Sequence, residues 1–394
     1  MQDSTEGTEN GLDLVYASDG ISPHDDFWVP RFQQWGDVLE VGFSPEPRAH
    51  RPRFTLPGMR RVERIRFLGT LLSLAPRVAF TRWASTHTKG LWIAKDAMKY
   101  GPVVTAAGVR PFVLMVWGSD VLVWPNRSFA VRAIVQSVLR SAGLIVAGGE
   151  DLRSMCIELG AEPERVVVVP WYDYKEVQRS RIGPQERCSL RDKLGIQETD
   201  VAVVSSRWHA PVYSVETLIS AAPAAIRRFP RLRFIIIGSG PLTPKLKRTC
   251  TDLGVSERFT FLGRMERPDV LRYTQAADIY VSTSLSDVSS VSLLDSMALG
   301  VPVVVTNIPG NRQWVHDGVE GLLFQRRDSA TLTNLLVQLA ESMPMRDKLS
   351  AAARSVVLAR TDWNANSEVL RSRLQRLAKA VGSNDHSSPE NASR

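Results

Sequence analysis

Two carboxylates separated by seven residues stand in the stretch of the sequence that carries the most chemistry, SLSDVSSVSLLDSMALGVPVVVTNIPGNRQWVHDGVEGLLF (284–324). Asp287 comes just after a strand-like run, DIYVSTS (278–284), and Asp295 falls in the first turns of a helix expected at about 291–299. A carboxylate suits a vicinal diol, such as that of a sugar, because it accepts two hydrogen bonds and donates none. The plain alternative is that both aspartates only cap and charge the start of a helix.

The residues between the two aspartates favour an anion. Val288, Ser289 and Ser290 open the expected helix. The first backbone N–H groups of a helix have no partner within it, and the helix dipole attracts negative charge to this end. The spacing therefore predicts a loop that holds a diphosphate between two carboxylates that hold sugar hydroxyls.

Composition sets limits on the class of protein. The 394 residues are 44% hydrophobic and 23% charged, which is typical of a soluble globular protein with room for two domains. The net charge of +8 favours anionic partners, but no zinc finger or RNA-recognition signature accompanies it, so we expect no nucleic acid. Cysteines 156, 188 and 250 lack the spacing of a zinc site or a disulfide framework. With no apolar run of eighteen residues and no secretory signal, we expect a cytoplasmic protein.

The hydrophobic pattern indicates an α/β fold. Short apolar runs alternate with longer amphipathic ones, which is typical of a parallel sheet with helices on both faces. The expected strands are 12–18, 38–43, 111–116, 143–147, 165–169, 201–206, 233–238, 259–263, 278–284, 302–306 and 321–324.

Two doubly wound domains follow from this rhythm, because it restarts after a polar, arginine-rich stretch. We place an N-terminal domain at 12–185 and a C-terminal domain at 186–362. A helix at 363–381 is a candidate to cross back to the N-terminal domain, and the polar ends 1–11 and 382–394 are expected to be disordered. Ligands of such sheets bind beyond the carboxyl ends of the strands, so the cleft between the domains is the expected site.

The chain resembles retaining glycosyltransferase family 4 over most of residues 12–380. The family's Glu-x7-Glu followed by LLEAMA-x-G-x-PVV is similar to Asp287-x7-Asp295 and LLDSMALGVPVV in this sequence. The resemblance implies a GT-B fold, two Rossmann-like domains facing each other across a cleft. It also implies that Asp287 contacts the donor sugar and Asp295 the ribose. Each carboxylate is one methylene shorter than in the family pattern, which alters its reach.

Two further segments of the C-terminal domain are similar to family motifs. IIIGSGP (235–241) resembles the strand-turn IVGxGP, in which Gly238 and Gly240 would let the backbone approach the nucleotide. The third glycine of a dinucleotide fingerprint is missing, which counts against a nicotinamide enzyme. FLGRM (261–265) resembles FLGxV, whose backbone meets the nucleotide base, and this implies that role for Leu262 and Gly263.

The segment SSRWHAPVY (205–213) resembles the family's diphosphate clamp, GR-x-x-x-x-K-G. Arg207 matches the arginine, and a guanidinium is a good bidentate partner for phosphate. The lysine is absent, and Tyr213 stands close to its place. The resemblance therefore assigns Arg207 to the clamp and leaves His209 or another basic group to compensate, unless the phosphate is held with fewer charges. The alternative is that Arg207 is a surface residue.

The N-terminal domain supplies the expected acceptor-binding residues. SPHDDFWVPRFQQWGDVLEVGF (22–43) resembles the family's opening segment and places His24 after the first strand; a lone histidine is otherwise structural or solvated. VWGSDVL (116–122) resembles the strand end where many members carry a histidine. Trp117 stands there instead and could stack on a sugar, and Asp120 is the nearest polar candidate. The basic and apolar stretch 58–83 is either an amphipathic surface helix or a contact with an anionic membrane.

We therefore expect a retaining glycosyltransferase that moves a hexosyl or N-acetylhexosaminyl group from a nucleotide sugar, most commonly a UDP-sugar in this family, to a hydroxyl of a small-molecule or lipid-linked acceptor. We expect no metal and no cofactor besides the donor. We leave open a peripheral contact of the protein with the inner face of a membrane. The alternative is a non-catalytic or epimerase-like nucleotide-sugar-binding protein on the same fold.

Overall fold

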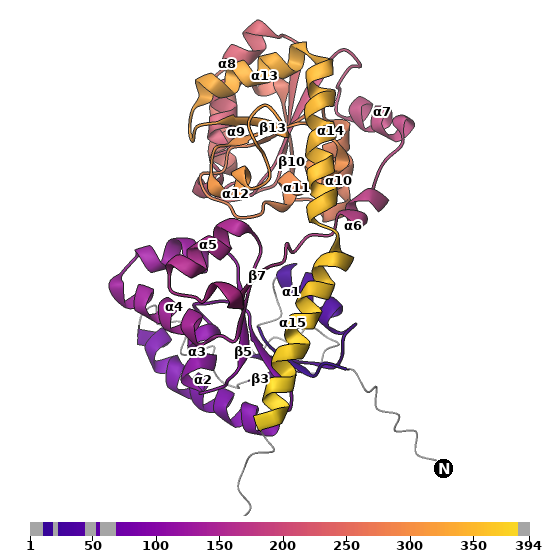
Figure 1. Cartoon of the computed structure of the whole chain (residues 1–394). Helices are drawn as coiled ribbons and strands as arrows, with labels where there is room; N and C mark the ends of the chain where they lie inside the picture. Colours follow the sequence, from indigo (N-terminus) through magenta and orange to yellow (C-terminus); the bar gives the residue numbers. More distant parts are fainter. Residues whose placement is uncertain (1–10, 19–22, 44–52, 56–67, 385–394) are drawn as a thin grey trace, which may run out of the picture. The chain divides into compact units, whose positions relative to one another are not determined.

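The computed structural model describes residues 11–18, 23–43, 53–55 and 68–384, with side chains omitted at 23–24, 53–55, 68–73 and 381–384. The chain forms two compact units (Figure 1). Unit 1 comprises Met1–Trp171 together with Asn364–Arg394, and unit 2 comprises Tyr172–Trp363. Each unit is built around its own parallel sheet.

Unit 1 holds a seven-stranded parallel sheet in the order β3-β2-β1-β4-β5-β6-β7. Five of its strands were predicted, and β3 and β4 were missed. Strands β1, β4, β5 and β6 are buried throughout, as expected for a sheet covered on both faces. The strands are β1 (Leu14–Ala17), β2 (Val38–Gly42), β3 (Arg53–Thr55), β4 (Leu91–Ala94), β5 (Phe112–Val116), β6 (Leu144–Ala147) and β7 (Val166–Val168).

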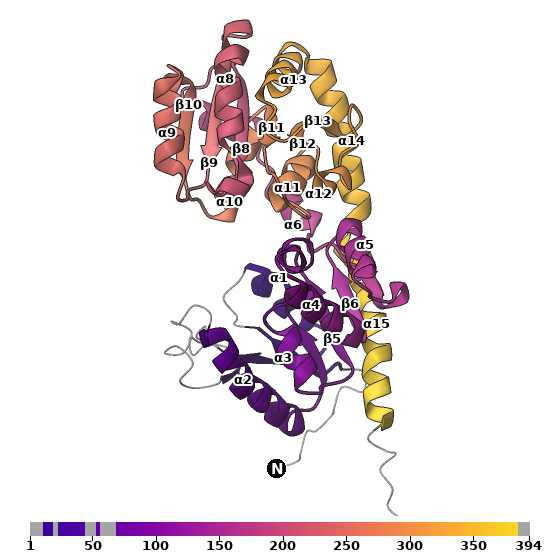
Figure 2. The same cartoon turned by 90° about the vertical axis from the view of Figure 1, so that its left-hand side faces the viewer.

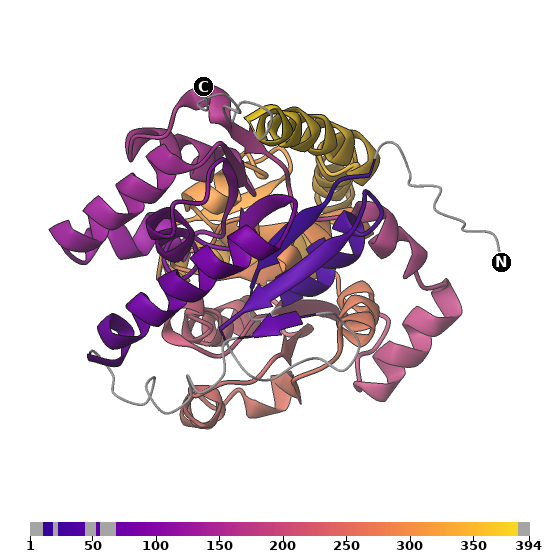
Figure 3. The same cartoon turned by 90° about the horizontal axis from the view of Figure 1, so that it is seen from below.

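Helices lie on both sides of this sheet. Figures 1 and 3 show α2, α3 and α4 on one side of the strands and the yellow α15 on the other. The α-helices are α1 (Pro23–Phe32), α2 (Leu68–His87), α3 (Gly101–Ala106), α4 (Phe129–Ser141), α5 (Glu150–Glu158) and α15 (Trp363–Asn384). Short helical turns are η2 (Ser119–Val123), η3 (Trp124–Asn126) and η4 (Pro163–Arg165).

Unit 2 holds a six-stranded parallel sheet in the order β10-β9-β8-β11-β12-β13. All six strands were predicted, since each carries a run of apolar residues, although β10 at the edge of the sheet is only half-buried. They are β8 (Val201–Ser206), β9 (Leu232–Ile237), β10 (Phe259–Gly263), β11 (Ile279–Ser282), β12 (Val303–Thr306) and β13 (Gly321–Phe324).

Two hydrophobic cores cover the two faces of this sheet. Helices α8, α9 and α13 pack into one core, and α6, α10, α11 and α14 pack into the other; Figure 2 shows the blocks of helices around the strands. The α-helices are α6 (Tyr174–Arg179), α7 (Pro184–Lys193), α8 (Glu216–Arg228), α9 (Thr243–Asp252), α10 (Arg267–Ala276), α11 (Val291–Leu299), α12 (Pro309–Arg312), α13 (Ser329–Glu341) and α14 (Met343–Arg360), with short turns η5 (Pro211–Tyr213) and η6 (Ser256–Arg258).

The division between the units falls at Trp171 and Tyr172, upstream of the predicted position at 185/186. The intervening residues belong to unit 2, because Val177 of α6 is buried in its core. Two arginines of the stretch that suggested the boundary are paired: Arg187 and Arg191 donate to the two oxygens of Asp278 at 2.6 and 2.9 Å. Charged residues of this stretch therefore form ion pairs within unit 2.

The C-terminal residues belong to unit 1 from Asn364 onward. Arg373 of α15 donates from Nη1 to the carbonyl oxygen of Glu164 at 2.9 Å. Gly143 lies so close to Leu377 that an added Cβ would approach its side chain to 3.0 Å. Helix α15 is described as far as Asn384, and the predicted tails 1–11 and 382–394 lie largely outside the described residues. Within the described residues, no helix combines the length and the apolar character needed to cross a bilayer.

Candidate functional site

The carboxyl edge of the unit 2 sheet brings together two loops from its centre. Strands β8 and β11 are neighbours, and the strand order runs outward from them in opposite directions. Ligands of doubly wound sheets bind at such a switch point. Arg207 comes directly after β8, and Asp287 lies in the loop that follows β11. The topology therefore places these two predicted residues at the same place.

The guanidinium of Arg207 is the centre of this site. It donates from Nη1 to the hydroxyls of Ser290 and Ser292 at 2.5 and 2.9 Å, and from Nη2 to a carboxylate oxygen of Asp287. Its side chain is 9% exposed and that of Asp287 is 19% exposed. The ring centroid of Tyr213 lies 4.4 Å from the guanidinium carbon. Four predicted residues thus meet here, and Arg207 is not a surface arginine.

Burial and pairing act on this guanidinium in opposite directions. Burial acts to lower the pKa of Arg207, but Asp287 together with Tyr280 and Tyr213 outweighs it, so the pKa is raised. Arg207 is therefore a fixed positive charge at the carboxyl edge of the sheet.

The loop after β11 is held in shape by Gly310, which sequence reasoning missed. A Cβ added at this glycine would lie 2.2 Å from the carbonyl oxygen of Asp287 and 2.4 Å from that of Val288. Helix α12 therefore fits against the loop only because residue 310 has no side chain. The dipeptide Pro309-Gly310 is a turn signal in the sequence, but it gives no indication of this contact.

The start of α11 faces the same site. Ser290 is its N-cap residue, and its side chain makes no capping hydrogen bond. The Ser290 hydroxyl instead accepts from Arg207. The buried Ser289 hydroxyl accepts from the indole N–H of Trp314 at 3.3 Å. The first-turn amides therefore have no side-chain cap, as an anion site at a helix N-terminus requires.

Asp295 lies one turn further along α11 in a buried setting. Its Oδ1 accepts from Arg267 Nη2 at 2.8 Å and from the hydroxyl of Tyr172 at 2.9 Å. Burial raises the pKa of Asp295 to about 6, although Arg267 and Tyr172 oppose the shift. Arg267 and Tyr172 were not predicted, because residues distant in sequence give no local signal of this pairing.

His209 does not supply the missing positive charge. Its Nδ1 lies 2.8 Å from the hydroxyl oxygen of Thr243, and burial lowers the pKa of the ring below its usual value of 6.5. The imidazole is therefore largely neutral at pH 7. Its Nε2 is buried, and no partner for it lies among the described residues.

Gly238 and Gly240, which follow β9, lie in close contact with the backbone of residues 207–209. An added Cβ at Gly238 would lie 2.1 Å from the carbonyl oxygen of Arg207, and at Gly240 it would lie 2.5 Å from that of His209. Gly238 also has a φ of 122°, which a side chain disfavours. Both glycines thus allow the 207–209 segment to pack, and their approach to the nucleotide stays a prediction.

Leu262 and Gly263 lie at the end of the edge strand β10. The register of β10 shifts between Phe261 and Gly263, so Leu262 is the extra residue of a bulge. The carbonyl oxygen of Gly263 accepts from the amide of Gly238 at 2.7 Å. The backbone of Leu262 is thus released from the regular ladder at the position predicted to meet the base.

The predicted acceptor-binding residues lie in unit 1. His24 is in the first turn of α1, and its side chain lies outside the described part of the structure. Trp117 is half-buried, donates from its indole to the carbonyl oxygen of Lys95, and meets Trp171 edge-on at 6.1 Å. The buried Asp120 accepts from the amides of Ala97, Trp117 and Gly118. These contacts give Asp120 a part in fixing the loops after β4 and β5.

A buried ion pair at the switch point of unit 1 was missed. Lys95, directly after β4, donates to Asp25 Oδ2 at 2.7 Å, and the Asp25 side chain is fully buried. The hydroxyls of Tyr16 and Ser18 donate to the other oxygen of Asp25. Lys95 stands within KDAMK, a stretch with no motif that would signal this pair.

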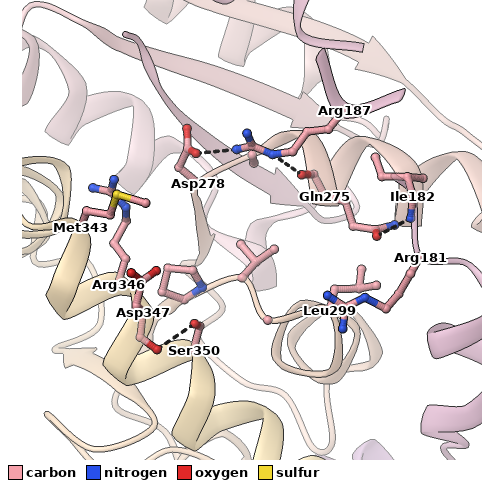
Figure 4. Close-up of a pocket in the computed structure, with 14 residues that line it drawn as sticks. Arg181, Ile182, Arg187, Gln275, Asp278, Leu299, Met343, Arg346, Asp347 and Ser350 are labelled. Atoms are coloured by element: carbon pink, nitrogen blue, oxygen red, sulfur yellow. Dashed lines mark hydrogen bonds and ion pairs between the residues drawn. The ribbon is translucent and has the colours of Figure 1, made fainter. Parts of the chain in front are cut away.

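A separate hollow of about 370 Å³ lies at the amino edge of the unit 2 sheet. Figure 4 shows Arg187 bonded to Asp278, with Arg181 and Arg346 on different sides of the space. Asp278 comes just before β11 and also accepts from Arg191 and from the amide of Ala202. Since Arg207 follows a parallel strand, the hollow and the candidate site lie at opposite edges of the sheet.

Metal independence stays a prediction. Within the described residues, no cluster of three or more His, Cys, Asp or Glu side chains could hold a metal ion. The positive groups of the site are instead Arg207 and the amino end of α11.

Known proteins resemble this chain in sequence and in fold. Residues 186–356 match the family described as glycosyl transferases group 1. A GDP-mannose-dependent monoacylated alpha-(1-6)-phosphatidylinositol monomannoside mannosyltransferase of Corynebacterium glutamicum is 31% identical over 199 residues, 49% of this chain and 51% of the relative. A D-inositol 3-phosphate glycosyltransferase of Geodermatophilus obscurus is 28% identical over 275 residues, 67% of this chain and 58% of the relative. The matches thus span little more than half of these relatives.

Among solved structures, HepE of Anabaena in complex with UDP has a TM-score of 0.77 at 20% identity, covering 93% of this chain and all of the other. The two parallel sheets and this likeness define a protein of the GT-B fold. Residues 186–356 are similar to the glycosyl transferases of group 1, and the resemblance to glycosyltransferase family 4 is confirmed.

Burial of Asp295 predicts a pH dependence of stability. Its pKa is raised from 3.8 to about 6 in the folded protein. Between these values the folded state binds more protons than the unfolded state, so this group's contribution to the free energy of unfolding falls as the pH rises. Asp295→Asn removes this contribution. The free energy of unfolding of the variant, relative to that of wild type, should rise by roughly 1 to 3 kcal/mol between about pH 4 and pH 7.

Urea denaturation at a series of pH values measures this difference. Asp347→Asn, which removes an exposed carboxylate of the same unit, is the matched control. A difference between Asp295→Asn and wild type that stays constant over the pH range would contradict the burial of an ionisable carboxylate.

Proposed function

We propose that this protein is a retaining glycosyltransferase that binds a nucleotide-sugar donor in unit 2 and transfers the sugar to a hydroxyl of a small-molecule or lipid-linked acceptor. One observation carries the proposal: a buried arginine, a carboxylate and an uncapped helix start meet at the switch point of the sheet. This set offers positive charge to a diphosphate and a hydrogen-bond acceptor to a sugar within one site.

The site residues take the following proposed roles. Arg207 and the amides that open α11 neutralise the charge that builds on the departing diphosphate, which is the largest catalytic effect these groups can supply. Asp287 accepts hydrogen bonds from the donor sugar, and Asp295 accepts them from the ribose. Asp287 is paired with Arg207 in the structure, so the donor would share or displace that contact.

The nucleotide is proposed to be UDP and the sugar a hexose or an N-acetylhexosamine. HepE was crystallised with UDP, whereas the Corynebacterium relative is named as GDP-mannose-dependent. The bulged Leu262 backbone would meet the base in either case. Transfer is proposed to need no metal, because Arg207 and the helix start supply the positive charge.

The acceptor is proposed to include lipid-linked molecules, with peripheral contact through α2 on the cytoplasmic face of a membrane. Leu74, Val78 and Trp83 line a shallow apolar hollow on this helix together with Arg82. Trp83 is 46% exposed. An exposed apolar face beside arginine, in a chain of net charge +8, suits an anionic bilayer.

Asp287→Asn tests the catalytic assignment. The amide cannot accept hydrogen bonds at both positions, so release of UDP from a UDP-sugar with acceptor present should fall on the order of a hundredfold. Binding of UDP itself should not weaken, because the variant keeps the size of the side chain and removes a competitor for Arg207. Product analysis with a soluble polyol phosphate and with a hydroxyl-bearing lipid in micelles gives the acceptor class.

Asp347→Asn is the control for this experiment and should turn over like wild type. Unchanged turnover in Asp287→Asn would contradict its role at the donor sugar. Nucleotide binding by the wild type with no product from any acceptor would favour a non-catalytic protein, and an isomeric nucleotide sugar formed without acceptor would favour an epimerase.

Trp83→Ala tests the membrane contact. Loss of the exposed indole should reduce sedimentation of the protein with phosphatidylglycerol vesicles about tenfold, with little binding of either form to phosphatidylcholine vesicles. Phe129→Ala removes another exposed aromatic side chain of unit 1, on α4, and should bind like wild type. Equal losses in the two variants would contradict a contact made by α2.

A further inference from the structure

An aromatic ring faces the guanidinium of Arg207, where the family pattern has a lysine. The Tyr213 ring centroid lies 4.4 Å from the Arg207 guanidinium carbon. We propose that Tyr213 is a positioning residue: its ring fixes the plane of the guanidinium so that one arginine can hold the donor diphosphate without a second cation. This inference rests on the proposed function, because it assigns Tyr213 a part in donor binding at the same site.

The hydrogen bonds of Arg207 leave donors for a ligand. A guanidinium has five N–H groups. Two are directed to Ser290 and Ser292 and one to Asp287. The N–H of Nε and one on Nη2 therefore remain, and Nε is buried with no partner among the described residues. Phosphate oxygens accept well from a guanidinium in such a fixed orientation.

A chain of hydroxyls anchors one edge of the guanidinium to the sheet. Ser292, which accepts from Nη1, lies 2.7 Å from the hydroxyl of Tyr280. Tyr280 is fully buried on β11, and burial raises its pKa while Arg207 opposes the shift. These contacts fix the position of Nη1. Once a donor shares or displaces the Asp287 contact of Nη2, rotation of the guanidinium plane about Nη1 becomes possible.

The Tyr213 ring opposes that rotation, because its own backbone is fixed. Tyr213 ends the short turn η5, and its carbonyl oxygen accepts from the Thr283 hydroxyl at 2.8 Å. The carbonyl oxygen of Val212 accepts from the amide of Leu285 at 2.7 Å. The loop after β8 is thus tied to the loop after β11, and the ring stays beside Arg207.

The surroundings strengthen the contact. A cation–π attraction grows when the cation is removed from water, and the Arg207 side chain is 9% exposed. A lysine at residue 213 would add charge but no flat surface. His209 is largely neutral and Arg267 is paired with Asp295, so within the described contacts the diphosphate part of the site relies on Arg207 and on the orientation of that residue.

The experiment measures dissociation constants for UDP and for uridine by calorimetry on the full chain. Tyr213→Leu should raise the Kd for UDP about tenfold, equivalent to about 1.4 kcal/mol, and change that for uridine less than about twofold. Tyr213→Phe keeps the ring and should restore most of the affinity for UDP. Tyr273→Leu, which removes a half-buried ring packed on the other core of unit 2, is the control for loss of packing.

A double-mutant cycle separates positioning from a structural role. If Tyr213 acts through the planar guanidinium, Tyr213→Leu should add little loss in an Arg207→Lys background. The same fold loss in both backgrounds, equal losses for UDP and uridine, or no rescue by Tyr213→Phe would overturn the inference. A wild-type protein that binds no nucleoside diphosphate would overturn the proposed function and this inference together, whereas undiminished UDP binding by Tyr213→Leu would overturn this inference alone.

Discussion

The guanidinium of Arg207 is almost completely removed from water. This buried charge constrains which residues can surround it at the carboxyl edge of the unit 2 sheet. A buried charge is costly unless it is paired and hydrogen-bonded. The surrounding residues meet this requirement with one carboxylate, two serine hydroxyls and one aromatic ring. The same arrangement provides a fixed donor to an incoming anion, so the groups that stabilise the folded site are also those that prepare it for a ligand.

The strand order and one glycine make this arrangement possible. Because β8 and β11 are neighbours, the loops that carry Arg207 and Asp287 start side by side although eighty residues separate the two side chains. The loop after β11 can then turn back over α12 only where Gly310 leaves space for the carbonyl oxygens of Asp287 and Val288. Sheet topology supplies the proximity, and close backbone packing supplies the detailed shape.

The sequence predicted the elements of unit 2 better than the contacts between them. Its strands are marked by apolar runs. In unit 1, β3 (RFT) has a single apolar residue and gives no such run, and β4 (LWIA) is an apolar run that was overlooked. The arginine-rich stretch before β8 was taken for the domain boundary, because composition cannot show that Arg187 and Arg191 both bind Asp278. Ser292, Arg267 and Tyr172 were missed for the same reason, since their partners are set by tertiary packing.

The central claim is that Arg207 holds the diphosphate of a nucleotide donor. The most direct test is calorimetric titration of wild type and Arg207→Ala with UDP and with uridine. Because the contact with the phosphates is charge-assisted, the variant should lose at least about tenfold in affinity for UDP, while uridine binds nearly as before. Equal losses for the two ligands would contradict it, since they would show that Arg207 supports the fold of the site and does not contact the phosphates.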